Sequence, residues 1–175
     1  TKLLPANALS GSFQTAQAEY LYGTYQGQWV VVREGSVAEA LPDETSTGRT
    51  AAIALCQNSD AKRVLVIGSG LGLCRQFLRL PQTEHVTWAH CDNEYVQQVN
   101  KFVPEELKIT DNRFYPMAGD IRAQLAGEKN YYDIVIINLP DATSSVLNRY
   151  YTHQFYQQVK ESLRSNGVLA VRITG

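Results

Sequence analysis

The sequence predicts an α/β domain with a doubly wound, mainly parallel sheet. Apolar runs rich in β-branched residues alternate with segments of helical periodicity, which is the pattern of buried strands covered by helices on both faces. The first run enters a loop with glycine at every second position. Because crossovers between parallel strands are nearly always right-handed, the expected strand order is 3-2-1-4-5. The five strands are expected at residues 63–67, 86–92, 114–117, 132–138 and 167–173.

The segment before this sheet predicts a small antiparallel meander. Residues 1–18 are small and polar, and we expect a loosely held lead-in there. Turn signals occur at Gln26-Gly27 and Glu34-Gly35. They separate three strand-type runs, at residues 20–25, 29–33 and 37–41. We therefore expect a meander over residues 19–45, with its aromatic side chains packed together or stacking on a substrate, and a main domain over residues 46–175.

Helices are expected between the strands of the main sheet. Ser46 or Thr47 is placed to cap a helix that carries residues 51–56. The remaining helices are expected at residues 94–102, 121–125 and 150–163. The chain ends soon after the fifth strand, where sheets of this kind usually continue through a helix and a hairpin. We therefore expect a truncated sheet whose open edge is covered by a missing segment or by the second copy of a homodimer.

Composition excludes several classes of protein. The 175 residues carry a net charge of −1 at pH 7, so no basic surface indicates a nucleic-acid partner. The three cysteines, Cys56, Cys74 and Cys91, lie far apart without metal-ligand spacing. This spacing is typical of reduced thiols in a cytoplasmic protein and indicates no metal site. No apolar run approaches the length of a transmembrane helix.

The loop Gly68-Ser69-Gly70-Leu71-Gly72 is the first candidate binding site. Glycine lets the backbone adopt positive φ angles and approach a ligand closely, and the loop leads to a helix N-terminus with unpaired N–H groups. The spacing G-x-G-x-G fits loops that bind S-adenosylmethionine better than the dinucleotide pattern G-x-G-x-x-G. It predicts a Rossmann-like fold of the class I S-adenosylmethionine-dependent methyltransferase type. The alternative is a plain tight turn between strand and helix.

Polar residues that follow the other strands are further candidates, because ligands of doubly wound folds lie across the carboxyl ends of the strands. Asp92 can accept both hydroxyls of a ribose, or it caps the next helix. Gly119 and Asp120 can hold an adenine ring, or Asp120 caps the short helix after it. Asp141, in a run that starts at Asn138, can hold or deprotonate an amine, or the run is a structural turn.

His90 leaves the same strand end as Asp92. It is therefore either a ligand contact or a packed, hydrogen-bonded side chain, which is the commoner role of a single histidine. The sequence contains no Ser/His/Asp arrangement and no metal-binding arrangement around it.

The chain resembles the spermidine/spermine synthase family over roughly residues 20–175. The resemblance rests on residues 64–72, 86–92, 119–120, 132–138 and 155–171. That family transfers an aminopropyl group from decarboxylated S-adenosylmethionine to an amine. The chain is most similar to a bacterial branch often fused to membrane segments, where runs like Asn138-Leu139-Pro140-Asp141 and, further on, Leu147-Asn148-Arg149-Tyr150-Tyr151-Thr152 recur.

The resemblance implies decarboxylated S-adenosylmethionine or S-adenosylmethionine as cosubstrate, a small amine as acceptor, and no metal. It also implies a cytoplasmic domain, with fusion to a membrane segment in the full-length chain. The catalytic residues would be Asn138 and Asp141. The cosubstrate would contact Gly68, Ser69, Gly70, Gly72, His90, Asp92, Gly119 and Asp120.

Four positions depart from the family pattern. Leu71 stands where the family has the Asp that holds the aminopropyl amine, and His90 stands where it has the ribose-binding Glu. Asn138 replaces the first Asp of the D-S-S-D-P loop, and Thr47-Gly48-Arg49 replaces a Tyr-His-Glu triplet. Three hypotheses follow: an aminopropyltransferase-like enzyme, a non-catalytic nucleotide-binding or regulatory domain that has lost the acids, and a methyltransferase with an unknown acceptor.

Overall fold

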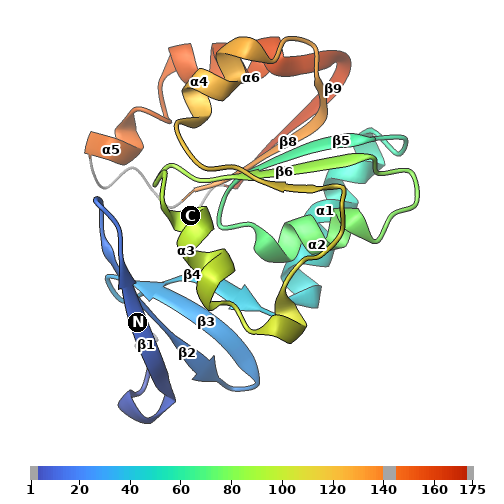
Figure 1. Cartoon of the computed structure of the whole chain (residues 1–175). Helices are drawn as coiled ribbons and strands as arrows, with labels where there is room; N and C mark the ends of the chain where they lie inside the picture. Colours follow the sequence, from blue (N-terminus) through green and yellow to red (C-terminus); the bar gives the residue numbers. More distant parts are fainter. Residues whose placement is uncertain (1–3, 140–144, 173–175) are drawn as a thin grey trace.

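The computed structural model describes residues 4–139 and 145–172, which form two sheets (Figure 1). A four-stranded antiparallel sheet makes up the N-terminal part, and a five-stranded parallel sheet with helices on both faces makes up the rest. The predicted α/β architecture, a Rossmann-like sheet preceded by antiparallel strands, is therefore confirmed.

The N-terminal sheet is a meander with strands in the order β1-β2-β3-β4. Its strands are β1 Leu9–Gln14, β2 Glu19–Tyr25, β3 Gln28–Arg33 and β4 Ser36–Leu41. The β2–β3 turn has positive φ at Gln26 (51°) and Gly27 (78°), and the β3–β4 turn has it at Glu34 (49°) and Gly35 (76°). Positive φ at both central residues is typical of tight hairpin turns, so the two turn signals in the sequence are confirmed.

Strand β1 lies inside the stretch that the sequence predicts as a loosely held lead-in, and the structure corrects this for residues 9–14. Ser10, Gly11 and Ser12 give little local strand signal, because small polar residues have low strand propensity. Phe13 supplies the tertiary reason: it is 6% exposed, and its ring centroid lies 4.9 Å from that of Tyr20 and 5.8 Å from that of Phe102.

The central sheet has the order β7-β6-β5-β8-β9, and each neighbouring pair is parallel. Its strands are β5 Arg63–Gly68, β6 His85–Ala89, β7 Phe114–Pro116, β8 Tyr132–Asn138 and β9 Leu163–Val171. In chain order this is the predicted 3-2-1-4-5 arrangement. The chain adds β6 and β7 on one side of β5 and then β8 and β9 on its other side, so the strand order reverses between β5 and β8. This switch point is where doubly wound folds bind ligands.

The helices cover the two faces of the central sheet (Figure 1). They are α1 Glu44–Gln57, α2 Leu71–Leu78, α3 Tyr95–Phe102, α4 Ile121–Gly127, α5 Ser145–Asn148 and α6 His153–Ser162, with 3₁₀ turns at Ala6–Ala8 and Glu105–Leu107. Within the described ranges, no helix is both long and apolar enough to cross a membrane.

Three boundaries differ from the sequence prediction, and in two of them a side-chain cap sets the start of a helix. Asp43, and not Ser46 or Thr47, caps α1, since its carboxylate accepts a hydrogen bond from the Ser46 N–H (3.1 Å). Thr152 caps α6 by accepting from the Phe155 N–H (3.2 Å), so this helix begins three residues later than expected at residue 150. Strand β9 begins at Leu163 and not at residue 167, because Leu163 pairs with Tyr132 ahead of an irregularity in the ladder.

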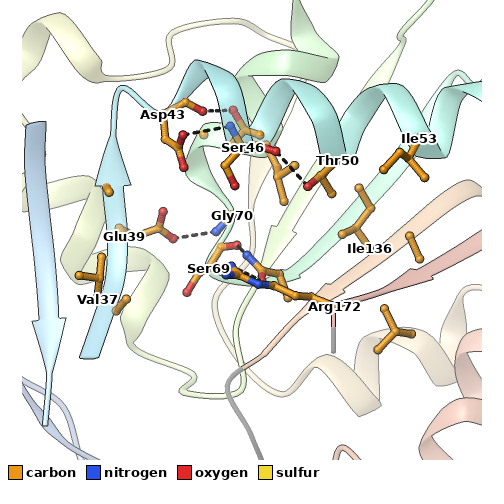
Figure 2. A pocket seen from close by; sticks show the side chains of 18 residues that line it. Val37, Glu39, Asp43, Ser46, Thr50, Ile53, Ser69, Gly70, Ile136 and Arg172 are labelled. Carbon is orange, nitrogen blue, oxygen red and sulfur yellow. Dashed lines mark hydrogen bonds between the residues drawn. The ribbon is translucent and has the colours of Figure 1, made fainter. Parts of the chain in front are cut away.

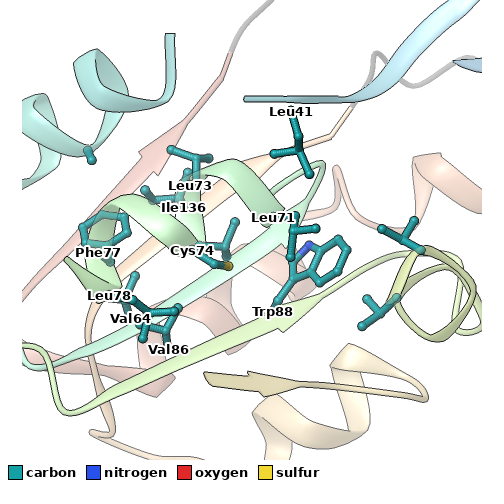
Figure 3. Close-up of a cluster of buried hydrophobic side chains, with 14 of the residues drawn as sticks. Leu41, Val64, Leu71, Leu73, Cys74, Phe77, Leu78, Val86, Trp88 and Ile136 are labelled. Carbon is teal, nitrogen blue, oxygen red and sulfur yellow. The ribbon is translucent and has the colours of Figure 1, made fainter. Parts of the chain in front are cut away.

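Alternate residues of the central strands enter two separate cores. Val64, Val66 and Trp88 belong to one core, which helices α1, α2 and α3 and the N-terminal sheet also fill (Figure 3). Leu65 and Ile67 point to the other, which α4, α5 and α6 cover. This twofold alternation explains the continuous apolar runs in the sequence, because both faces of the strands are buried.

Candidate functional site

The Gly loop sits at the end of β5 and is held against the end of β8. Gly68 has a φ of +102°, and a Cβ there would collide with the Asn138 carbonyl oxygen. Ser69 donates its N–H to that oxygen (3.1 Å), and the Asn138 side-chain amide donates to the Ser69 carbonyl (2.5 Å). The indole N–H of Trp88, on the neighbouring strand β6, donates a hydrogen bond to the Gly68 carbonyl (2.9 Å). These contacts fix the loop at the switch point of the sheet.

A pocket of about 530 Å³ opens beside this loop (Figure 2). Its walls come from strand β4, helix α1, the Gly loop and the last residues of β8 and β9. Four of the sequence-predicted site residues line it: Ser69, Gly70, Gly72 and Asn138. The pocket therefore lies where the two sheets meet, at the carboxyl ends of the central strands.

Glu39 on β4 is a pocket residue that the sequence analysis missed. Its carboxylate accepts a hydrogen bond from the Gly70 N–H (2.7 Å), and the residue is 5% exposed (Figure 2). Gly70 has no side chain with which to cap α2, so Glu39 supplies the acceptor from the other sheet. Burial raises the pKa of Glu39 to about 8, although the N–H groups of Gly70 and Leu71 act in the opposite direction. The sequence held one sign of this role: Glu39 is two residues before Leu41 on the same strand, so both side chains point to the same, buried face.

Asp92 binds the N-terminal sheet to the central sheet. It is 1% exposed, and its Oδ2 accepts hydrogen bonds from the hydroxyls of Thr15 (2.6 Å) and Tyr20 (3.0 Å). Its Oδ1 accepts from the Glu94 N–H (3.2 Å) just before α3. This contact is a local turn and not a cap, because Glu94 is the N-cap residue of α3 and no side chain caps that helix. The predicted capping role of Asp92 is therefore wrong, and the structure shows instead a long-range role that the sequence did not reveal. A ribose would have to displace Thr15 or Tyr20 to reach this carboxylate, so ribose binding stays a prediction.

His90 is packed inside the protein and does not line the pocket. It is 6% exposed, its ring stacks on Tyr95 (4.0 Å between centroids), and its Nδ1 accepts from the Asp92 N–H (3.0 Å). Burial lowers the pKa of His90 to about 4, and the nearby Asp92 only partly offsets this. The side chain therefore stays neutral at pH 7 in the folded protein.

This buried histidine predicts that the domain loses stability in acid. The unfolded chain takes up a proton on His90 near its ordinary pKa of about 6.5, whereas the folded chain resists until about pH 4. Because the unfolded state binds more protons between these values, stability falls as the pH drops through this window, by on the order of 3 kcal/mol at most. Urea unfolding of wild type and His90→Gln at pH 7 and pH 4.5 measures this difference.

The glutamine variant should lose less stability on acidification than the wild type. Burial also lowers the pKa of His85. Because His85 is present in both proteins, its contribution to the acid loss of stability cancels in the comparison. His153→Gln, at an exposed position on α6, is the matched control. Equal acid losses in wild type and His90→Gln would contradict the assignment.

Asp120 and Gly119 follow β7 at the same edge of the sheet. Asp120 caps α4 by accepting from the Arg122 N–H (2.9 Å), and its Oδ2 lies 3.4 Å from an Nη2 of Arg149. The Asp120 side chain is 39% exposed, so it combines a capping role with access to solvent. Gly119 has a φ of +107° with no atom within 4 Å of a Cβ position, so its backbone conformation, and not crowding, favours glycine there.

The remaining predicted positions add no ligand contact within the described residues. Leu71 is fully buried in the core beneath the loop (Figure 3), so it presents no acceptor to a ligand. Asp141 lies outside the described residues. Among the residues that the structure describes, no group of three or more His, Cys, Asp or Glu side chains is arranged to hold a metal ion.

The fold and this site together define a Rossmann-like domain of the methyltransferase type with a Gly-loop pocket at its switch point. Residues 47–172 match the family model described as the spermine/spermidine synthase domain, and the chain belongs to this family. It is a spermidine synthase-like domain whose relatives are polyamine aminopropyltransferases.

Two of these relatives show the extent of the similarity. A polyamine aminopropyltransferase of Thermoanaerobacter pseudethanolicus is 29% identical over 122 residues, which cover 69% of this chain and 44% of that protein. Polyamine aminopropyltransferase 2 of Bacillus anthracis is 29% identical over 114 residues, which cover 62% of this chain and 31% of that protein. This chain thus spans less than half of the length of these relatives.

Solved structures agree on the fold. Spermidine synthase from Thermotoga maritima superposes with a TM-score of 0.78 at 21% identity, covering 94% of this chain and 57% of that one. A spermidine synthase in complex with the transition-state analogue AdoDATO superposes with a TM-score of 0.81, also at 21% identity, covering 94% of this chain and 58% of that one.

Proposed function

We propose that this domain binds decarboxylated S-adenosylmethionine and a small amine in the Gly-loop pocket and transfers an aminopropyl group between them at a low rate. The pocket at the switch point carries this proposal, because it joins the loop, the end of β8 and the N-terminal sheet in one cavity. The names of the relatives give the class of acceptor, a polyamine or its precursor.

The chemistry assigns different tasks to the residues of the site. The amine nitrogen forms a bond to the carbon next to the sulfonium, the carbon–sulfur bond breaks with its electron pair going to sulfur, and the new ammonium loses a proton. Ser69 and Gly70 line the pocket and let the ligand approach the backbone. Asn138 can orient the amine through its side-chain oxygen but cannot take its proton. We assign that proton to Asp141, three residues further on in the sequence.

A second candidate is a non-catalytic domain that binds a nucleoside and reports it to a partner. The replacement of acids by Leu71, His90 and Asn138 favours this candidate, because a domain that only binds a nucleoside does not need the acids that hold a cationic amine.

Product analysis separates the candidates. The purified domain is incubated with decarboxylated S-adenosylmethionine and putrescine, and in parallel with S-adenosylmethionine, and products are followed by mass spectrometry. Methylthioadenosine together with an aminopropylated amine supports the proposal. S-adenosylhomocysteine would indicate a methyltransferase, and binding without either product would leave the non-catalytic candidate.

We further propose that the full-length protein belongs to the membrane-fused bacterial branch and places this domain on the cytoplasmic side. The run that ends Arg149-Tyr150-Tyr151-Thr152 supports this, and Arg149 pairs with Asp120 at the candidate adenine position. A homodimer through the β9 edge is the proposed arrangement of two such domains. Sequencing the complete reading frame and measuring the mass of the domain in solution test the two parts separately.

Asp120 provides a test of the adenine position. Asp120→Ala is expected to weaken methylthioadenosine binding by about 1–3 kcal/mol, since a buried donor on the ligand would lose its acceptor. Asp120→Asn keeps a side-chain acceptor and a helix cap, so it is expected to bind nearly as well as the wild type. Calorimetric titration measures both, and an unchanged affinity of Asp120→Ala would leave Asp120 as a cap alone.

A further inference from the structure

Glu39 is a buried acid that belongs to neither the sequence pattern nor the resemblance. It lies on β4 of the N-terminal sheet, 31 residues before Gly70, yet its carboxylate accepts a hydrogen bond from the N–H of Gly70, the N-cap residue of α2 (Figure 2). It also lines the pocket together with Ser69 and Asn138. A second sheet therefore inserts a carboxyl group into the place where the ligand meets the loop.

The position of this carboxyl group reverses the usual charge preference of a helix N-terminus. Such an end ordinarily attracts an anion, because unpaired N–H groups and the helix dipole face it. Here Glu39 already accepts from Gly70. A ligand carboxylate brought to the same place would find the Gly70 donor occupied, and it would oppose the ionisation of Glu39. A ligand ammonium would find an acceptor within a largely dehydrated wall.

The other ionisable groups around Glu39 do not cancel this preference. Cys74 and Tyr95 lie behind it, and burial raises the pKa of both, so they are neutral at pH 7. Asp43, a second acid in the pocket lining, caps α1. Arg172, the cation of the pocket wall among the described residues, is exposed and has an Nη1 3.4 Å from the Asn138 side-chain oxygen.

We propose that Glu39 is a charge-selecting residue of this pocket: it accepts the ammonium group of a cationic ligand arm and disfavours ligands that carry a carboxylate on that arm. This inference rests on the proposed function, since it takes the ligand to be a sulfonium nucleoside. It assigns the selection between ligand charges to a residue of the N-terminal sheet. The Gly loop does not make this selection, because Leu71 is buried and has no hydrogen-bond acceptor in its side chain.

A proton-coupled binding reaction follows from the burial of Glu39. Without a ligand, the acid is mostly protonated at pH 7, because its pKa is raised to about 8. An arriving ammonium favours the ionised form, so binding should release a proton. A purely structural role for Glu39 would not produce this signal.

Calorimetric titrations with three ligands test the proposal. Decarboxylated S-adenosylmethionine carries the ammonium arm, S-adenosylmethionine adds a carboxylate to it, and methylthioadenosine lacks the arm. Wild type is expected to bind the decarboxylated form about 10- to 100-fold more tightly than S-adenosylmethionine, as for one charged hydrogen bond. Titration in buffers of different ionisation enthalpy should show about one proton released near pH 7.

Glu39→Gln preserves the shape of the side chain and an acceptor for Gly70 but removes the charge. We expect its preference between the two sulfonium ligands to fall to within about threefold, its proton release to disappear, and its affinity for methylthioadenosine to stay within about twofold. Glu84→Gln, which removes an exposed acid paired with Lys62 at the opposite end of the sheet, is the matched control and should behave as the wild type.

The outcomes separate the inference from the proposed function. If methylthioadenosine binds but Glu39→Gln keeps the wild-type preference, the role of Glu39 is overturned and the proposed function stands. If Glu39→Gln loses affinity for methylthioadenosine as well, the role of Glu39 is only to hold the Gly loop in place, and the inference is overturned. If none of the three ligands binds the wild type, the proposed function fails and the inference fails with it.

Discussion

In an assay with putrescine and decarboxylated S-adenosylmethionine, the domain is expected to turn over several powers of ten more slowly than a typical enzyme. Leu71, His90 and Asn138 stand at three positions where the resemblance to the spermidine/spermine synthase family implies acids. Leu71 is fully buried, and His90 is buried and neutral at pH 7, so neither offers a carboxylate to a cation. If each lost charged contact costs on the order of 1.5–3 kcal/mol and the losses are partly additive, the barrier rises enough to produce this slowing.

The structure also explains why one reversion should not restore the rate. The Asn138 amide donates to the Ser69 carbonyl (2.5 Å), and an aspartate at this position would turn that contact into a repulsion between two acceptors. Asn138→Asp is therefore expected to disturb the Gly loop before it helps the amine. A rate constant for the wild type within the ordinary range of about 1–1000 per second would contradict the prediction. It would place most of the chemistry on Asp141 and the backbone.

Gly68→Ala is expected to destabilise the domain by more than about 3 kcal/mol, a large part of the 5–15 kcal/mol that stabilises a typical domain. A φ of +102° at this residue costs a side chain on the order of 1–3 kcal/mol by itself. The added Cβ would also collide with the Asn138 carbonyl, which is backbone and cannot rotate away. Unfolding in guanidinium chloride, followed by circular dichroism, measures the loss.

Gly48→Ala is the matched control for this experiment. Gly48 lies within α1, and no atom lies within 4 Å of its Cβ position. Alanine there should stabilise the domain by about 0.5–1 kcal/mol, because it favours the helix and reduces the entropy of the unfolded chain. A Gly68→Ala variant within about 0.5 kcal/mol of the wild type would show that the loop is free to rearrange.

The sequence was sufficient for the central sheet because its signals are local and strong. The run from Tyr132 to Asn138 has four consecutive β-branched residues at its centre, 134–137, and this pattern is typical of a covered parallel strand. The strand order then follows from the handedness of the crossovers, and the hairpin turns follow from Gln26-Gly27 and Glu34-Gly35.

The interface between the two sheets was not predictable in the same way, because its contacts join residues far apart in the chain. Thr15 and Asp92 are 77 residues apart and meet at 2.6 Å, and no local pattern announces that hydrogen bond. Strand β1 was missed for the same reason, since Phe13 gains its partners only in the folded protein. Glu39 showed a weak signal as an acid on an inward face, but its partner Gly70 became evident only in three dimensions.

Ligand is expected to bind at the switch point, in the pocket between the Gly loop and the N-terminal sheet. The most direct test titrates ¹⁵N-labelled protein with methylthioadenosine and follows the backbone amide resonances. The resonances of Ser69, Gly70 and Glu39 are expected to shift, while those of Glu84 and Glu128, at the opposite ends of the strands, are expected to stay in place. Shifts confined to that opposite end, or no shifts at millimolar ligand, would contradict this expectation.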